Sequence, residues 1–288
     1  MSTTTTTSVK VVLENDASYI PRGNVDAPIK FFSEPEDGSV PYNLMKAHLQ
    51  SHTTPNYPLN PHTISINDIR DHESEYLLEQ DGFQAVSNVT SAADPAFTDE
   101  ENIKSVWYPE VEAFVRTLLP EAKRVFAFNH IVRRSKPGFD NFPLTSAHVD
   151  QTAVSTENAI RMFLPNEADE LIKGRYRALN VWCPINGPVQ ATPLAIAAPS
   201  SVPENDLVRI ELRYPNYSSE TQMLKYNPAH KWYYWSGMTN EDRLTFMIMD
   251  NKEDAVTKRA PHSAFVDPRT PRGARERDSI ETRVFVFG

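Results

Sequence analysis

The chain has 288 residues, of which 40% are hydrophobic and 23% charged, and this is the composition of an ordinary globular protein. Its net charge of −9 argues against a surface that binds nucleic acid or anionic membranes. The only cysteine, Cys183, excludes an internal disulfide and suits a reducing compartment. We therefore expect a cytoplasmic protein in which Cys183 is a small buried hydrophobe.

Residues 19–88 have weak periodicity and many turn-forming residues. We expect a disordered tail over residues 1–8 and a short strand over residues 10–13. Two short helices are expected over residues 42–50 and 68–80. We interpret this region as an N-terminal arm packed on the rest of the chain, so that residues 9–288 form one domain.

A longer helix is predicted to begin at Thr98. The run Thr98-Asp99-Glu100-Glu101 matches a capping box, and large apolar residues follow at helical spacing as far as Leu118. Pro109 should kink this helix or split it into two pieces, because proline removes a hydrogen-bond donor. The apolar stripe is expected to pack against a sheet.

After Pro120 the hydrophobic pattern changes to period two, which is typical of β-strands. Short helices are expected only after Ser155 and Thr156, as far as Leu164, and then over residues 165–173. The expected strands cover residues 124–134, 148–150, 178–185, 207–213, 223–226, 231–236, 244–250 and 279–287. This order predicts a mainly β fold with a helical buttress, built on a double-stranded β-helix (jelly roll, cupin-like) core.

One short strand carries a pattern that suits metal binding. His148 and Asp150 are two residues apart, so both side chains point to the same face if the chain is extended. Two histidines and one carboxylate form the facial triad of non-haem Fe(II) oxygenases. A histidine two residues before an acidic residue is expected about once by chance in this composition, so the pattern needs support from elsewhere.

His262 is the best candidate for the third ligand. It begins the apolar extended stretch His-Ser-Ala-Phe-Val, which is expected to neighbour the strand that carries His148. His130 could line the site or only pack, and His230 is expected to be exposed in a turn. The histidines before the strand region are expected to be solvated; they are His48, His52, His62 and His72.

The last strand adds a second candidate site. Arg277 and Ser279 share one face with Glu281 and Arg283. An arginine and a serine at this spacing can bind one carboxylate, such as the distal end of 2-oxoglutarate. The alternative is a solvated edge strand in which Glu281 pairs with a neighbouring arginine.

Several segments resemble the fungal hydroxylase/desaturase family, typified by the gibberellin desaturase and the 7α-cephem methoxylase subunit. They fall in order over roughly residues 120–288, whereas the first 120 residues match only loosely. Cys183 and Gly237 depart from the pattern, where we expect larger polar and acidic residues. The matching segments are Asn129–Arg134, Ala147–Thr152, Asn180–Ile185, Gly187–Gln190, Tyr226–Trp235, Ala260–Phe265 and Arg277–Arg283.

The resemblance implies an Fe(II)- and 2-oxoglutarate-dependent dioxygenase that uses O2 to hydroxylate, desaturate or cyclise a small secondary metabolite. The residues would take the roles already named: His148, Asp150 and His262 on iron, Arg277 and Ser279 on 2-oxoglutarate. Candidate substrate contacts are Arg133, Arg134 and Tyr234.

Two other classes remain open. A cupin-type metalloenzyme would keep the triad without 2-oxoglutarate, and a non-catalytic partner subunit of an oxygenase complex would keep only the fold. The sequence leaves the substrate, the reaction outcome and the oligomeric state undecided.

Overall fold

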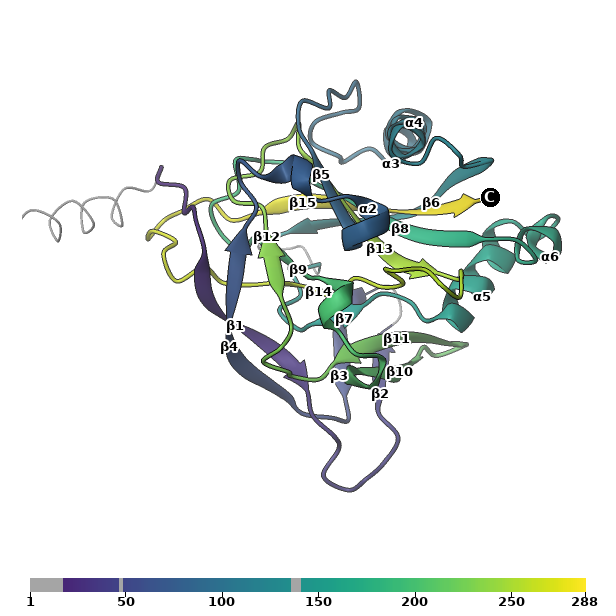
Figure 1. Ribbon diagram of the computed structural model, residues 1–288, viewed down its shortest axis with the longest axis horizontal. Helices are drawn as coiled ribbons and strands as arrows, with labels where there is room; N and C mark the ends of the chain where they lie inside the picture. The colour runs from purple at the N-terminus through teal and green to yellow at the C-terminus, as the bar shows by residue number, and fades with distance from the viewer. Residues whose placement is uncertain (1–17, 47–48, 136–140) are drawn as a thin grey trace, which may run out of the picture.

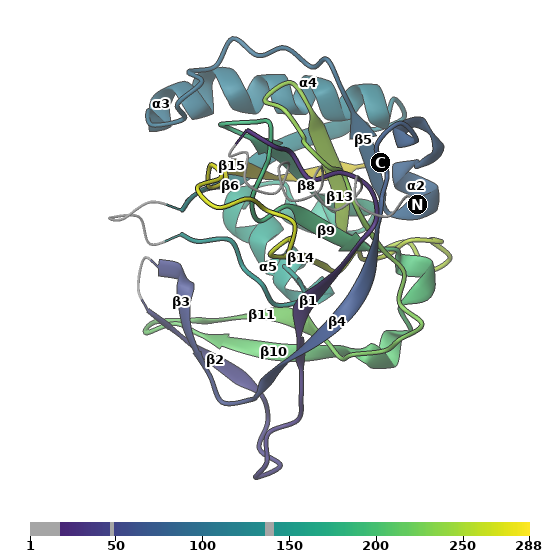
Figure 2. The same ribbon diagram turned by 90° about the vertical axis from the view of Figure 1, so that its left-hand side faces the viewer.

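The computed structural model describes residues 18–46, 49–135 and 141–288. Two sheets lie face to face, with the long helix on the outer side of the smaller one (Figure 1, Figure 2). The expected tail and the expected strand at residues 10–13 lie outside the described residues. The strands are β1 (Val25–Phe32), β2 (Tyr42–Lys46), β3 (Leu49–Pro55), β4 (Leu59–Asp68), β5 (Phe83–Val86), β6 (Arg124–Arg134), β7 (His148–Val149), β8 (Tyr176–Pro184), β9 (Leu194–Ala197), β10 (Leu207–Arg213), β11 (Ser218–Leu224), β12 (Trp232–Tyr234), β13 (Arg243–Asp250), β14 (His262–Ala264) and β15 (Asp278–Phe287).

The larger sheet has the strand order β1-β4-β12-β9-β14-β7-β11-β10-β2-β3, and the smaller sheet has the order β5-β13-β8-β15-β6. Most strand pairs are antiparallel, as a jelly roll requires. Strands predicted after Pro120 are present, with bounds that differ by a few residues. Residues Val25–Asp68, expected to be an arm, supply β1 to β4 of the larger sheet.

The C-terminal strand β15 lies between β8 and β6, so it is a central strand and the edge-strand alternative is wrong. Its two faces have different neighbours. Ile280 and Val284 pack in the core beneath the long helix, and Thr282 accepts a hydrogen bond from Trp107 Nε1 at 2.8 Å. The opposite face, which carries Glu281 and Arg283, is turned to the space between the sheets.

The long helix has three consecutive pieces, α3 (Glu100–Asn102), a π-helical turn (Ile103–Trp107) and α4 (Tyr108–Leu118). Its cap is Asp99, one residue later than predicted, whose carboxylate accepts a hydrogen bond from Glu101 N at 3.0 Å. Pro109 lies in the first turn of α4, directly after the π-helical turn. The predicted interruption at Pro109 is thus present, because proline cannot donate the backbone hydrogen bond that would continue the ladder.

The helices predicted over residues 42–50 and 68–80 are wrong in kind or extent. The first region forms β2 and β3, joined in an antiparallel pair. In the second, β4 runs to Asp68, and only a 3-10 helix (Glu73–Glu75) and α2 (Leu78–Asp81) follow. Asp71 has φ +69°, a left-handed conformation that cannot continue a helix.

Helix α5 (Ala153–Phe163) begins directly after the His148–Asp150 segment, earlier than predicted; α6 (Ala168–Leu171) follows it. Thr152 is the N-cap of α5: Thr152 Oγ1 accepts a hydrogen bond from Ser155 N at 3.1 Å, and Ser155 Oγ accepts one from Thr152 N at 2.8 Å. This reciprocal pair fixes the direction of the chain immediately after Asp150.

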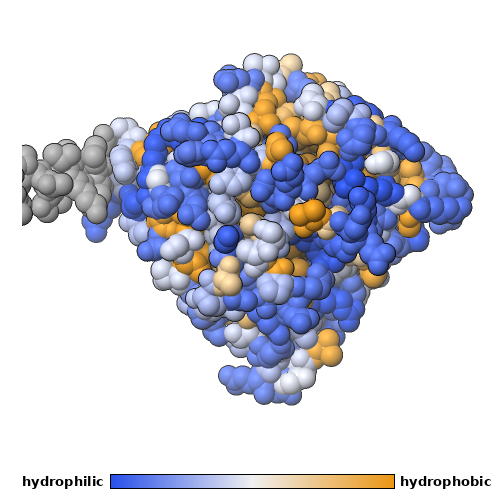
Figure 3. Space-filling model, viewed as in Figure 1, coloured by the Kyte–Doolittle hydropathy of each residue, from blue (hydrophilic) through white to orange (hydrophobic). Residues whose placement is uncertain are grey.

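The face of the molecule in Figure 3 is mainly hydrophilic, with apolar patches scattered over it. In the part of the chain that the structure describes, no helix has both the length and the apolar character needed to cross a bilayer.

Candidate metal centre and adjoining cavities

Three potential metal ligands meet between the two sheets. His148 in β7 pairs directly with His262 in β14 on the neighbouring antiparallel strand. The Nε2 atom of His148 lies 3.4 Å from Asp150 Oδ1, and that of His262 lies 3.8 Å from the same oxygen. The donor atoms of all three residues lie within 4.8 Å of one another.

The two imidazoles are held in the tautomer that a metal needs. His148 Nδ1 donates to the carbonyl of Ser146 at 2.8 Å, and His262 Nδ1 donates to that of Ala260 at 3.2 Å. A carbonyl only accepts, so each Nδ1 carries the hydrogen and each Nε2 keeps its lone pair. Burial, and then the neighbouring His148, lower the pKa of His262 to about 3, so this ring is neutral.

Asp150 is held as an anion and aimed at the histidines. Its Oδ2 accepts hydrogen bonds from Asn180 Nδ2 at 2.8 Å and Arg283 Nε at 3.2 Å, while Oδ1 faces His148 and His262. Burial opposes ionisation, but the Arg283 guanidinium holds the pKa of Asp150 well below its usual range. Two imidazoles and one carboxylate are the donor set of a non-haem Fe(II) site, so the residues fit such an ion.

A small inner cavity, which offers about 20 Å³ of room to water-sized spheres, opens beside the two histidines and extends to Arg277. Arg277 is 2% exposed, lies over the Trp182 ring, and donates through Nη1 to the Thr192 carbonyl at 2.7 Å. Its Nε has no partner among the described residues, and neither has the buried Ser279 Oγ on the same strand face. Burial and then Arg133 lower the pKa of Arg277 to about 9.

Such a cation favours a carboxylate ligand. Within ion-pair distance of Arg277 there is no carboxylate in the described part of the chain, although the residue is completely enclosed. A buried guanidinium without a counter-ion is costly unless a ligand supplies one. The lining of the inner cavity therefore suits a small dicarboxylate, with the Arg277 cation at one end and His148 and His262 at the other.

Comparison with known proteins agrees with this site. A family described as an oxidoreductase/YMDC permease-like domain matches residues 29–287. The hydroxylase/desaturase poxK of Penicillium oxalicum is 30% identical, with 93% of this chain and 92% of that protein aligned. The hydroxylase/desaturase efuI of Hormonema carpetanum is 31% identical over 91% of this chain and 95% of its own.

The chain belongs to the fungal hydroxylase/desaturase family. Its fold is that of the iron and alpha-ketoglutarate-dependent endoperoxidase NvfI, with a TM-score of 0.81, 24% identity, and 93% and 99% of the two chains covered. The expected family and the jelly-roll fold are thus confirmed.

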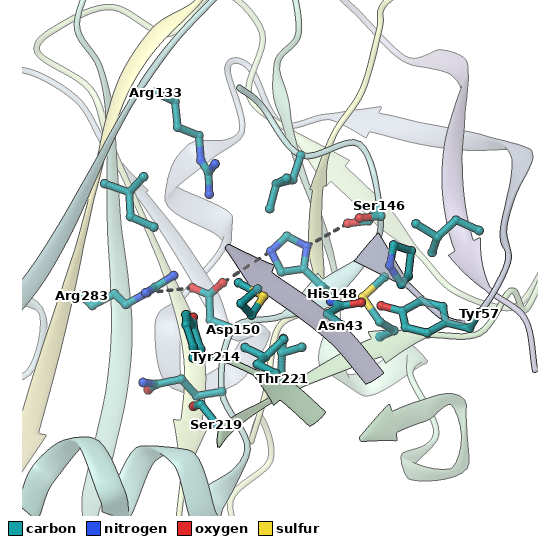
Figure 4. A pocket seen from close by; sticks show the side chains of 18 residues that line it. Asn43, Tyr57, Arg133, Ser146, His148, Asp150, Tyr214, Ser219, Thr221 and Arg283 are labelled. Carbon is teal, nitrogen blue, oxygen red and sulfur yellow. Dashed lines mark hydrogen bonds and ion pairs between the residues drawn. The ribbon is translucent and has the colours of Figure 1, made fainter. Parts of the chain in front are cut away.

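A second, larger cavity lies on the other side of His148 in this hydroxylase/desaturase. It is open at its mouth and offers about 200 Å³ of room to water-sized spheres. Figure 4 shows its lining, in which Asp150 and Arg283 lie opposite Tyr57. His148, Arg133 and Leu144 border both cavities, so a ligand in one would lie next to a ligand in the other.

The three expected substrate residues lie in different places. Arg133 points into the large cavity, and one of its nitrogens donates to the Phe142 carbonyl at 3.0 Å (Figure 4). Arg134 lies on the other face of β6, paired with Asp278 at 3.2 Å. Tyr234 donates to the Gly23 carbonyl at 2.7 Å and lines neither cavity. We therefore retain only Arg133 as a candidate.

The structure also shows where the two remaining strand-region histidines and the cysteine lie. His130 packs on the long helix, with Nδ1 2.9 Å from Tyr108 OH, and does not line either cavity. His230 is buried and lies 2.9 Å from Asp206, so its expected exposure is wrong. Cys183 is buried as expected, against Arg243 and outside both cavities.

Sequence reasoning missed two partners of Asp150. Asn180 lies in β8, whose residues are all buried, so a polar amide inside an apolar run was a readable signal of a buried contact. Arg283 was expected only to share a strand face with Arg277 and Ser279, yet it contacts Asp150. That contact depends on how the two sheets face each other, and no spacing in the sequence indicates it.

Proposed function

We propose that this protein is an Fe(II)/2-oxoglutarate-dependent dioxygenase that hydroxylates, desaturates or cyclises a small secondary metabolite. Its membership of the hydroxylase/desaturase family supports the reaction class. Relatives of the same family include the Fe(II)/2-oxoglutarate-dependent dioxygenase nvfI of Aspergillus novofumigatus, 28% identical over 82% of this chain. The observation that carries the proposal is the enclosed Arg277 beside the His148–Asp150–His262 cluster.

In this proposal His148, Asp150 and His262 hold iron, and there are no catalytic side chains beyond these ligands. Bound iron, with 2-oxoglutarate and O2, supplies the oxidising chemistry. The protein orients the ligands: the Ser146 and Ala260 carbonyls fix the imidazoles, while Asn180 and Arg283 fix the carboxylate.

Arg277 and Ser279 would bind the distal carboxylate of 2-oxoglutarate, the first through its free Nε and the second through its free hydroxyl. Trp182 and Leu194 line the inner cavity and would lie against the carbon chain of 2-oxoglutarate. An ion pair at this buried end would be strengthened by the low local dielectric.

The substrate would occupy the large cavity, with Arg133 positioned to meet an oxygen of either the substrate or 2-oxoglutarate. Hydroxylation, desaturation and cyclisation differ in which substrate carbon faces the iron. The chain's part in that choice is the shape of the cavity wall.

The test is anaerobic titration of the metal-free protein with Fe(II), then with 2-oxoglutarate, followed by measurement of succinate in air. We expect one Fe(II) per chain and formation of succinate that depends on both additions. His262→Ala should lose nearly all iron binding, whereas the exposed His72→Ala should keep it. Normal iron affinity in His262→Ala, or no succinate from the loaded wild type, would falsify the proposal.

A further inference from the structure

The end of the large cavity that lies away from the metal candidates is lined by β2. Asn43 and Met45 border the cavity, whereas Leu44 between them points outward and is 49% exposed. Strand β2 is three positions from β7 in the larger sheet, which corresponds to roughly 14 Å along the sheet. A side chain on β2 therefore meets a part of the ligand that is remote from His148.

Asn43 holds an unused hydrogen-bond acceptor at this end. The residue is 8% exposed, and its Oδ1 has no hydrogen-bond partner among the described residues. An amide oxygen that is removed from water and left unpaired is destabilising, and buried polar side-chain atoms in proteins normally have a partner. The cavity is where a partner can arrive.

Tyr57 supplies a donor beside this acceptor. It is 6% exposed and lines the same cavity (Figure 4). Burial raises the pKa of Tyr57 to about 12, partly offset by hydrogen bonding from Asn43, so the phenol keeps its proton. The phenol O–H can therefore donate to a ligand in the cavity.

The charged residues of the large cavity lie away from Tyr57. In Figure 4 the charged side chains Arg133, Asp150 and Arg283 lie on the other side of the cavity. A carboxylate at the Tyr57 end would therefore lose its hydration without gaining a cation. The cavity also has apolar lining residues, which are Met45, Pro55, Leu59, Ile131, Leu144, Leu212 and Met223.

We propose that Asn43 and Tyr57 form a subsite for a hydroxyl group, and that the substrate is a neutral alcohol on an apolar skeleton whose reacting carbon lies at the other end. A hydroxyl donates to Asn43 Oδ1 and accepts from Tyr57 at the same time. An ether or a ketone only accepts, and a carboxylate adds a charge. This inference rests on the proposed function for the position of the reacting carbon.

The test uses calorimetric titration of the metal-free protein with three probes of one rigid skeleton, 1-adamantanol, 1-methoxyadamantane and adamantane-1-carboxylate. The wild type should bind the alcohol about tenfold more tightly than the ether or the carboxylate. Asn43→Leu should bind the alcohol and the ether within about twofold of each other, and Tyr57→Phe should weaken the alcohol by several-fold. The matched control is Leu44→Ala on the same strand, which should keep the preference.

Thermal unfolding separates binding from folding. Asn43→Leu should melt no lower than the wild type, because it removes an unpartnered buried oxygen. Equal binding of alcohol and ether by the wild type, no detectable binding of the alcohol, or an unchanged preference in Asn43→Leu would overturn the subsite. These measurements use no iron. They can therefore refute the hydroxyl subsite while the wild type still forms succinate, and they can support the subsite even if the wild type forms none.

Discussion

Arg277 and Arg283 lie at the two ends of one face of the segment Arg277–Arg283, which begins one residue before β15, and they have opposite electrostatic surroundings. Arg283 meets Asp150 at 3.2 Å, and although burial acts against it, Asp150 and Glu281 raise the pKa of Arg283. Arg277 is more deeply buried, and burial and the nearby Arg133 lower its pKa. The fold thus supplies a counter-ion at one end, whereas the other end requires one from a ligand.

The largest effect is expected from Asp150→Asn, which removes a proposed ligand and leaves Arg283 without its carboxylate. Iron affinity should fall by more than about a hundredfold. The metal-free protein should also lose about 2 kcal/mol of unfolding free energy, less than for a fully enclosed pair because Arg283 keeps some exposure and lies 3.9 Å from Glu281. Anaerobic Fe(II) titration and urea unfolding measure the two effects, and a variant that loses neither would contradict this reading of the Arg283 end.

Arg277→Gln should have the opposite profile. No carboxylate of the described residues forms an ion pair with Arg277, and Glu281 acts on it only from a greater distance, so urea unfolding of the variant should match or exceed the wild type. The dissociation constant for 2-oxoglutarate should rise by about a hundredfold, the scale for truncating a buried charge pair. Iron affinity should stay within about twofold, and a loss of stability without a change in 2-oxoglutarate binding would remove the difference between the two ends.

Arg283→Gln tests whether the arginine beside Asp150 acts on iron binding and not on 2-oxoglutarate binding. It keeps Asp150 but removes the guanidinium that orients it, so iron affinity should fall by about tenfold, the lower end for loss of a residue that orients a ligand. The affinity of the iron-loaded protein for 2-oxoglutarate should change little. If this variant instead loses 2-oxoglutarate and keeps iron, the carboxylate site lies at the Arg283 end.

The smallest expected effect is that of Ser279→Ala. One hydrogen bond to a carboxylate would be lost, so 2-oxoglutarate should bind about fivefold more weakly. When Ser279→Ala is introduced into the Arg277→Gln variant, the affinity for 2-oxoglutarate should fall little further if both residues hold one carboxylate. A double-mutant cycle measured by equilibrium binding tests this, and fully additive effects would indicate that Ser279 binds something else.

The sequence was most informative where local patterns are strong. Alternation predicted β6 and β10 with the observed bounds, and the spacing of His148 and Asp150 predicted a shared direction that the geometry bears out. Prediction failed over residues 42–50 and 68–80. In the first, pairing with other strands outweighs local propensity; in the second, Asp71 takes a left-handed conformation.

By itself, the sequence determined the family, the jelly-roll fold and the residue types at the candidate metal site, because short motifs and period-two alternation are local properties of the chain. Only the tertiary structure decided which arginine has a carboxylate partner. Arg277 and Arg283 are equivalent in the strand pattern, and they differ because Asp150 reaches Arg283 from the side of the opposite sheet. Charge pairing depends on distance through space, which residue spacing along one strand does not contain.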